Sequence, residues 1–284
     1  VTSPLAGQAP GAGTASTVAP PTLAGCEDER TGLAVLQSLG LNLAANRVNV
    51  WVFDWSWADV DLDSWSRNLR LGWDWDETQF GVNMFLHPYH GSAYFAAARA
   101  SCLSYWEAVP ITFLGSWTWE FLAERARPSL NDFWMTGFGG AAMGEILHRI
   151  SALILDEEAG GGERIARELA GMVVNPIGGA DRLARGQLTG RAVNPVDRVP
   201  ESYLVRLNMG GRRVQESGSA RGPSSSPTLL LDVELGDVFD TEYRAPFDVI
   251  NLMAQVSPDG GGVNVLRATG RLYGRELTAR DSWH

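Results

Sequence analysis

The amino-acid sequence predicts an α+β protein, in which a helical module with a polar core precedes a set of antiparallel β-strands. Residues 87–156 carry most of the apolar helical pattern and three of the four histidines. Residues 203–273 instead alternate apolar and polar side chains, and the Pro-Asp-Gly-Gly-Gly run at 258–262 is a strong hairpin signal. A membrane barrel needs about eight strands or more. The strands therefore form an open sheet against the helices or belong to a longer outer-membrane β-barrel.

The first part of the chain is predicted to hold a leader, a helix and a strand. Residues 1–30 are rich in Gly, Ala, Pro, Ser and Thr, which indicates a disordered leader. Its Cys26 lacks the basic and apolar stretches that precede the cysteine of a lipoprotein signal. Residues 32–45 have the period of an amphipathic helix. Residues 64–76 alternate, with three tryptophans on one face, and predict a strand covered by helices or by lipid.

Three helices are predicted in the central stretch. The first covers residues 92–106, and the second covers residues 111–124 after Pro110, which suits a helix start. The third follows Ser129, a plausible N-cap with Asp132 at the N3 position. Glycines at 140 and 144 are unfavourable within this third helix, so we expect them at a close helix–helix contact.

The remaining elements follow in order. Residues 161–174 have the pattern of an amphipathic helix that ends at Asn175-Pro176, and residues 180–187 add a short helical turn. Residues 191–200 are a linker between a helical module at 31–195 and an antiparallel β segment at 200–284. Strands are predicted at 203–209, 229–235, 247–256 and 263–273, with a loop at 217–227, and the end of the chain just past a strand suggests truncation or an unfinished sheet.

Composition excludes some classes of protein. The net charge is −10, so nucleic acid is not expected as a partner. The chain is 45% hydrophobic, which is ample for a core. No uncharged apolar run reaches the roughly 18 residues of a membrane-spanning helix. The two cysteines, Cys26 and Cys102, have no metal-ligand spacing and define no disulfide framework.

Polar residues placed singly in the apolar central stretch are the candidate site. In an apolar setting a carboxyl group has a raised pKa and can serve as a general acid or base. The alternative is a structural network in which arginines neutralise the carboxylates, because buried charges must be paired. We expect Glu120 and Glu145 inside the module, each hydrogen-bonded to a basic or histidine partner: His87, His90, Arg99 or Arg149. The candidate catalytic residues are His87, His90, Glu120, Glu124, Asp132, Glu145 and Arg149.

Other chemistries receive less support. The sequence Glu145-x-x-His148, together with Glu120 and Glu124, resembles half of a di-iron carboxylate site, but the second such motif is missing. No Gly-x-Ser-x-Gly motif occurs, and the glycine-rich run at 137–140 lacks the Lys-Ser/Thr of a phosphate loop. We therefore assign no metal and no cofactor from the sequence.

The spacing of many residues in the central stretch is similar to one bacterial family, DUF3943, a domain of unknown function. The resemblance covers residues 68–186 well and the C-terminal strands more loosely, and it implies a protein of the bacterial cell envelope without an established activity. His148 stands where the family has an aromatic residue. The matching residues include His87-Pro88-Tyr89-His90-Gly91, Trp119-Glu120, Pro128-Ser129, Asn131-Asp132, Gly139-Gly140, Gly144-Glu145, Arg149, Asp156, Arg164, Glu168 and Asn175-Pro176.

Three hypotheses of function follow. The first is an outer-membrane-associated structural or binding protein, with an outer-membrane lipid or envelope component as its partner. The second is an envelope enzyme that acts on a lipid or polymer through a His/Glu acid–base site. The third is a soluble periplasmic binding module. Detergent-dependent extraction separates the first from the third, and a Glu120→Gln variant that keeps its fold tests the second.

Overall fold

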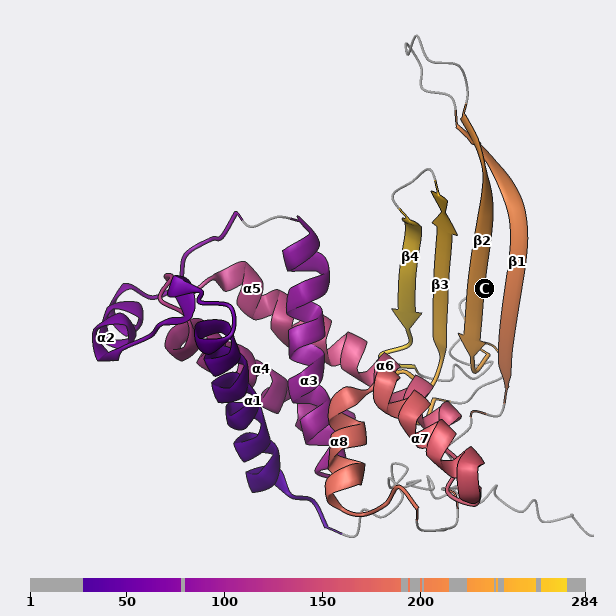
Figure 1. Cartoon of the computed structure of the whole chain (residues 1–284), viewed down its shortest axis with the longest axis horizontal. Coiled ribbons are helices and arrows are strands. Elements are labelled where there is room, and N and C mark those ends of the chain that lie inside the picture. The colour runs from indigo at the N-terminus through magenta and orange to yellow at the C-terminus, as the bar shows by residue number, and fades with distance from the viewer. Residues whose placement is uncertain are drawn as a thin grey trace, which may run out of the picture.

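The computed structural model describes residues 28–77, 80–189, 194, 200, 202–214, 224–237, 239, 243–258 and 262–274. Helices α1 to α8 form one module, and a four-stranded antiparallel sheet stands beside it, as Figure 1 shows. The predicted α+β class is confirmed. Residues 1–27 of the predicted leader at 1–30, and most of the predicted linker at 191–200, lie outside the described residues.

The first two helices differ from the prediction. Helix α1 spans Thr31–Trp51 and is longer than the 32–45 expected. After the short helical turn η1, Ser56–Ala58, helix α2 covers Leu62–Leu71, so the strand predicted at 64–76 is wrong. A capping box explains the helix, because the Asp61 carboxylate accepts from the backbone N–H of Ser64 while the Ser64 hydroxyl accepts from the N–H of Asp61. Ser64 and Asn68 then lie one turn apart on the buried face.

Helices α3 and α4 also begin earlier than predicted. Helix α3 spans His87–Ala100 and α4 spans Tyr105–Thr118. The expected boundary at Pro110 is wrong, because Ser104 and Glu107 form a capping box at the start of α4 and Pro110 lies inside it. Cys102, in the turn between the two helices, is disulfide-bonded, although the cysteine spacing predicted no such bond. Cys26 lies outside the described residues.

Three π-helical turns interrupt the central helices. They are η2 at Val82–Leu86, η3 at Trp119–Ala123 and η4 at Met135–Gly139. Between η3 and η4, the short helix α5, Leu130–Trp134, starts at Ser129, whose hydroxyl accepts from the backbone N–H of Asp132. The predicted N-cap is therefore confirmed. Single π-helical turns are uncommon and occur often at functional sites.

Helix α3 lies at the centre of the module. It packs on α1, α4, α8 and α6, the last of which spans Gly140–Ile154. The expected close contact at Gly140 and Gly144 is confirmed: a Cβ atom at Gly140 would lie 2.5 Å from the Cα of Gly91, and one at Gly144 would lie 2.7 Å from the Phe95 ring. Only glycine lets the two helices approach to this distance.

Two further helices and the sheet complete the fold. Helix α7 spans Gly161–Val174, as predicted, and Asn175 then caps α8, Pro176–Ala184, which begins earlier than the expected 180–187. The strands are β1 at Tyr203–Val214, β2 at Ser224–Leu235, β3 at Ile250–Ser257 and β4 at Gly262–Gly270. They pair in sequence order, and β2 begins within the expected loop at 217–227.

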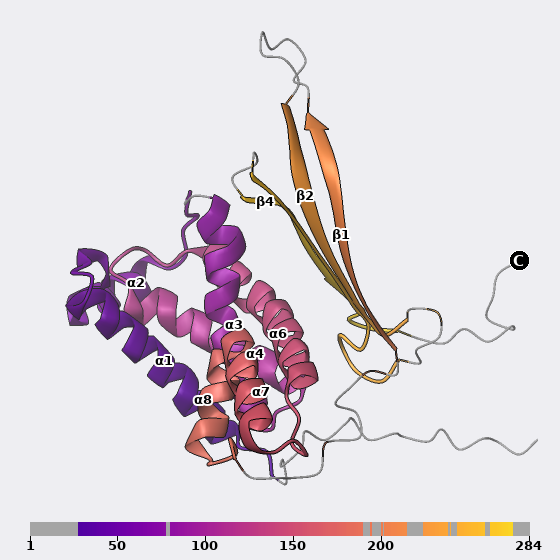
Figure 2. The same cartoon turned by 45° about the vertical axis from the view of Figure 1, so that its right-hand side comes forward.

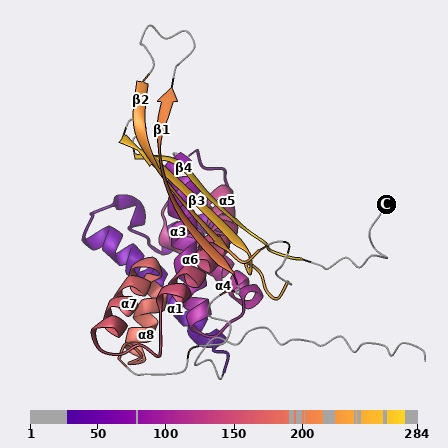
Figure 3. The ribbon, with the colours of Figure 1, turned by 90° about the vertical axis from the view of Figure 1, so that its right-hand side faces the viewer.

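The sheet is open and touches the module at one end. Figure 2 shows the long β1–β2 hairpin extending away from the helices, and in the view of Figure 3 the strands run obliquely in front of the helical module. Where sheet and module meet, Ile146 of α6 forms a buried cluster with Leu235, Phe247 and Ile250. Residues 202–213 of the β1 region are almost all exposed, so the outer part of the sheet has water or another partner on both faces.

Polarity is reversed across several helices of the module. Helix α1 buries Ser38, Asn42 and Asn46, whereas Leu36 and Leu43 are 68% and 64% exposed. Helix α2 likewise buries Ser64 and Asn68 and exposes its leucines, and α7 buries an Arg–Glu pair and exposes Ile165, Leu169 and Val173. Among the described residues, no helix has both the length and the apolar character needed to cross a membrane.

Candidate functional site

One histidine and two carboxylates converge at the centre of the module. His87 stands at the start of α3 directly after η2, Glu120 lies in η3, and Asp132 lies in α5 just before η4. Each residue could offer one ligand atom, and the three atoms lie within 4.8 Å of one another. We call these three residues the His87 cluster. Each of the three residues lies in or next to a π-helical turn, a feature that occurs often at functional sites.

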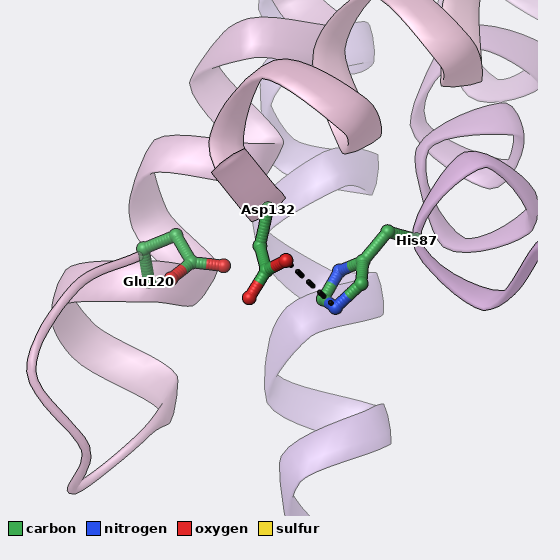
Figure 4. A group of neighbouring side chains, drawn as sticks. All are labelled: His87, Glu120 and Asp132. Atoms are coloured by element: carbon green, nitrogen blue, oxygen red, sulfur yellow. Dashed lines mark ion pairs between the residues drawn. The ribbon is translucent and has the colours of Figure 1, made fainter. Parts of the chain in front are cut away.

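The His87 ring contacts both α5 and η4. Its Nε2 lies 3.5 Å from Asp132 Oδ1, beyond a good hydrogen bond, and its Nδ1 lies 3.2 Å from the hydroxyl oxygen of Thr136. Figure 4 shows the Glu120 and Asp132 carboxylates approaching each other, with the imidazole beyond Asp132. Glu120 and Asp132 are buried and His87 is half-buried.

Glu120 lacks the basic partner that the sequence analysis expected. Its Oε2 accepts a hydrogen bond of 2.8 Å from the backbone N–H of Ser129, and within the described part of the chain this is its one hydrogen bond. The prediction that Glu120 is buried is confirmed, but a peptide group takes the place of the expected arginine or histidine. The neighbouring Glu124 accepts from the Trp119 indole N–H at 2.5 Å.

The carboxyl groups of this region hold their protons more strongly than ordinary ones. Burial raises the pKa of Glu120 well above its usual value, and the negative charge of Glu124 raises it further. Burial raises the pKa of Glu124 to about 7, against the hydrogen bond from Trp119. Burial also raises the pKa of Asp132, although His87 opposes this effect, while burial lowers the pKa of His87. The region therefore favours neutral side chains unless a cation is present.

A second polar chain lies beside the His87 cluster. His90 Nε2 is 2.8 Å from the Tyr94 hydroxyl, which donates to Asn42 of α1. Asn42 in turn donates to the carbonyl of Gly115 at 2.9 Å and to the Thr118 hydroxyl at 2.7 Å. Burial lowers the pKa of His90 to about 4, so its imidazole is neutral near pH 7.

Glu145 and Arg149 belong to a separate network. Arg149 donates to Glu145 at 2.9 Å, and Arg99 Nε forms an ion pair with the other carboxylate oxygen at 3.1 Å. Burial would raise the pKa of Glu145, but the two arginines hold it below its usual value. The expected arginine partner of Glu145 is confirmed. The group ties α6 to the segment that precedes β3, because Arg149 also donates to the carbonyl of Pro246.

The structure thus divides the predicted candidates into two groups. It brings His87, Glu120 and Asp132 together, with His90 and Glu124 beside them, and it places Glu145 and Arg149 in a structural ion pair. Sequence reasoning missed Asn42, Tyr94 and Thr136. The signal for Asn42 was present, because Ser38, Asn42 and Asn46 recur every four residues and form one polar face of a helix.

Comparison with known proteins relates the central segment to one family. The family model DUF3943, a domain of unknown function, matches residues 72–177, and this segment of the chain is similar to that family. The segment contains the whole His87 cluster and the Glu145 network. No curated protein and no solved structure matched the chain.

Proposed function

We propose that this chain is a bacterial envelope protein that associates with membrane lipid through the outer surface of its helical module. The observation that carries the proposal is the reversed polarity of α1 and α2. In water, a surface helix turns its leucines inward and its asparagines outward. Here Asn42, Asn46 and Asn68 are buried, while Leu36 and Leu43 are more than half exposed.

The buried amide N–H groups of α1 and α2 find hydrogen-bond acceptors inside the module, as a lipid environment requires. Asn46 donates to the carbonyls of Ala58 and Ala123, each at 2.8 Å, and Asn68 donates to the carbonyl of Glu124 at 3.0 Å. In hydrocarbon each polar group must find its partner within the protein. Such an interior, combined with an apolar exterior, suits contact with acyl chains better than contact with water.

Exposed tryptophans also support association with lipid. Trp51, at the end of α1, is 75% exposed, and Trp75, after α2, is 69% exposed. Tryptophan side chains are enriched where lipid headgroups meet acyl chains. The disulfide at Cys102 supports an extracytoplasmic location, because such bonds persist in oxidising compartments such as the periplasm.

Flotation with lipid vesicles tests the proposal. The full chain is mixed with vesicles of phosphatidylethanolamine and phosphatidylglycerol and centrifuged in a density gradient. We expect the protein to float with the vesicles at both low and 1 M salt, because a chain of net charge −10 binds these lipids through apolar contact and not through charge attraction.

A double variant identifies the surface that binds. Leu36→Ser with Leu43→Ser removes two exposed leucines from α1 and should weaken vesicle binding about tenfold or more, since each buried leucine contributes about 1 kcal/mol or more. Val263→Ser, at an exposed position on β4, is the control and should float like the unaltered chain. An unaltered chain that stays dissolved and does not float supports the alternative of a periplasmic binding module.

A further inference from the structure

The His87 cluster has the arrangement of a cation site. Its three side chains come from three different elements, α3, η3 and α5, and their facing atoms lie within 4.8 Å. Two ligands of one ion with bonds of about 2.1 Å lie about 3.0–3.4 Å apart at tetrahedral or octahedral angles. The distance of 3.5 Å between His87 Nε2 and Asp132 Oδ1 is close to this value. From the 4.8 Å limit, Glu120 would need to approach by up to about 1.4–1.8 Å, which a side-chain rotation can supply.

Each member of the cluster is held by a second polar group. Thr136 Oγ1 lies at Nδ1 of His87, so a proton on Nδ1 leaves the lone pair of Nε2 facing the cluster. Ser129 N–H holds one oxygen of Glu120, and Asn131 donates to Asp132 at 3.0 Å. Outer partners of this kind orient metal ligands in proteins.

The Glu120 carboxylate gives a second, independent indication that the cluster binds a cation. The residue is 3% exposed, and within the described residues its one hydrogen bond goes to Oε2. A carboxylate has about four acceptor positions, so most of them are unused. In Figure 4 one of its oxygens points toward Asp132, into the centre of the cluster.

Acidic side chains also surround Glu120. The charged groups that raise the pKa of Glu120 are the carboxylates of Glu124, Asp132 and Asp76. In the other buried networks of this chain an arginine faces each carboxylate, as with Glu145 and Glu168. A buried carboxylate that is ionised needs a positive partner. Within this region a bound cation would take the place that arginine has elsewhere.

We propose that His87, Glu120 and Asp132 bind one divalent transition-metal ion, Zn²⁺ or Mn²⁺. One imidazole and two carboxylates suit these ions, because imidazole favours zinc while carboxylates favour manganese. Three protein ligands leave a coordination position for water or for a ligand, as in catalytic metal sites. This proposal is independent of lipid association, because it concerns the interior of the module and not its surface.

Metal binding by the purified chain is the test. The full chain, without a histidine tag, is treated with EDTA, moved into chelator-free buffer and titrated with ZnCl₂ or MnCl₂ alone. Calorimetry and elemental analysis should give about one equivalent of Zn²⁺ or Mn²⁺, and the bound ion should raise the melting temperature. If the chain binds less than about 0.1 equivalent of Zn²⁺ and less than about 0.1 equivalent of Mn²⁺, the proposal is overturned.

Matched variants locate the ion. Asp132→Asn and His87→Gln should each weaken binding about tenfold or more, whereas His148→Gln removes a histidine outside the cluster and should bind as the unaltered chain does. Equal binding by Asp132→Asn overturns the proposal. If that variant fails to fold by circular dichroism, Thr136→Val decides: the loss of the group that orients His87 should weaken binding about tenfold, and unchanged binding overturns the proposal.

Discussion

Substitution of Gly91 by alanine tests the helix contact on which the module depends. Gly91 lies on the face of α3 that packs against η4 and α6. A Cβ atom built there would lie 1.9 Å from the backbone oxygen of Thr136 and 2.8 Å from the Cα of Gly140. Both neighbours are backbone atoms, so no side chain can rotate to make room.

The cost follows from the distance that the helices must move. A carbon–oxygen contact needs about 3.3 Å, so α3 and η4 must separate by about 1.4 Å. Overpacking of this kind costs about 1–3 kcal/mol or more, and a backbone clash belongs at the upper end. Alanine returns about 1 kcal/mol through its better helix propensity. We expect Gly91→Ala to lose about 2 kcal/mol of unfolding free energy, or about 4–8 °C in melting temperature.

Thermal unfolding followed by far-ultraviolet circular dichroism, in one detergent throughout, measures the effect. Gly40→Ala is the matched control: Gly40 lies inside α1, and a Cβ atom there would meet nothing within 4 Å. That variant should melt at the same temperature or slightly higher, because only the propensity changes. A Gly91→Ala protein as stable as the Gly40→Ala protein would show that α3 and η4 are not in close contact.

Three further predictions concern charge and capping. Burial, together with Arg99 and Arg149, lowers the pKa of His148 to about 3. The His148 imidazole of the unfolded chain takes up a proton near pH 6.5, whereas that of the folded chain stays neutral until about pH 3. The free energy of unfolding should therefore fall by up to about 1.4 kcal/mol per pH unit as the pH drops from 6.5 toward 3. Urea unfolding measured across this range should show a less steep fall in His148→Phe. Glu145→Gln leaves two arginines without a carboxylate and should cost about 3–5 kcal/mol by urea unfolding, whereas an effect below 1 kcal/mol would contradict the ion pair. Asp61→Ala removes the cap of α2 and should cost about 1 kcal/mol in the same assay, with no loss if residues 62–71 formed a strand.

Where apolar period and boundary signals agreed, the fold was predictable from the sequence. Helix α7 was predicted with its observed bounds, because its apolar residues repeat with helical spacing and Asn175-Pro176 marks its end. The four strands were located by their alternation and by the turn signal at 258–262, although β1 and β2 are longer than predicted. Their additional residues include glycines and serines, which carry no alternation of their own.

The strand predicted at 64–76 failed for a physical reason. The prediction took alternating tryptophans and leucines as one buried face. In α2, however, the buried residues are Ser64 and Asn68, and the leucines are exposed, so the apolar pattern did not mark the buried face of the helix. The capping signal of Asp61 and Ser64 was the better guide, because it depends on local hydrogen bonds and not on which face is buried.

The candidate site was predictable in its members but not in its partners. His87, Glu120 and Asp132 stood out because they interrupt apolar runs. The contacts that organise them come from tertiary structure: a peptide N–H at Ser129 and a hydroxyl at Thr136. No regular helical spacing in the sequence predicts either contact. The π-helical turns η3 and η4 each add one residue and so break the helical periodicity close to these groups.

Close glycine contacts, buried polar networks and apolar outer faces have one physical account if the module meets lipid. Between helices in lipid, burial of apolar side chains gives no driving force, because the acyl chains are equally apolar. Helices there associate through small residues that allow close packing and through hydrogen bonds between helices. The contact of Gly91 with Gly140 supplies the first, and the bonds from Asn42 of α1 to Gly115 and Thr118 of α4 supply the second. In water the same helices would gain more by burying Leu36 and Leu43, which the structure leaves outside.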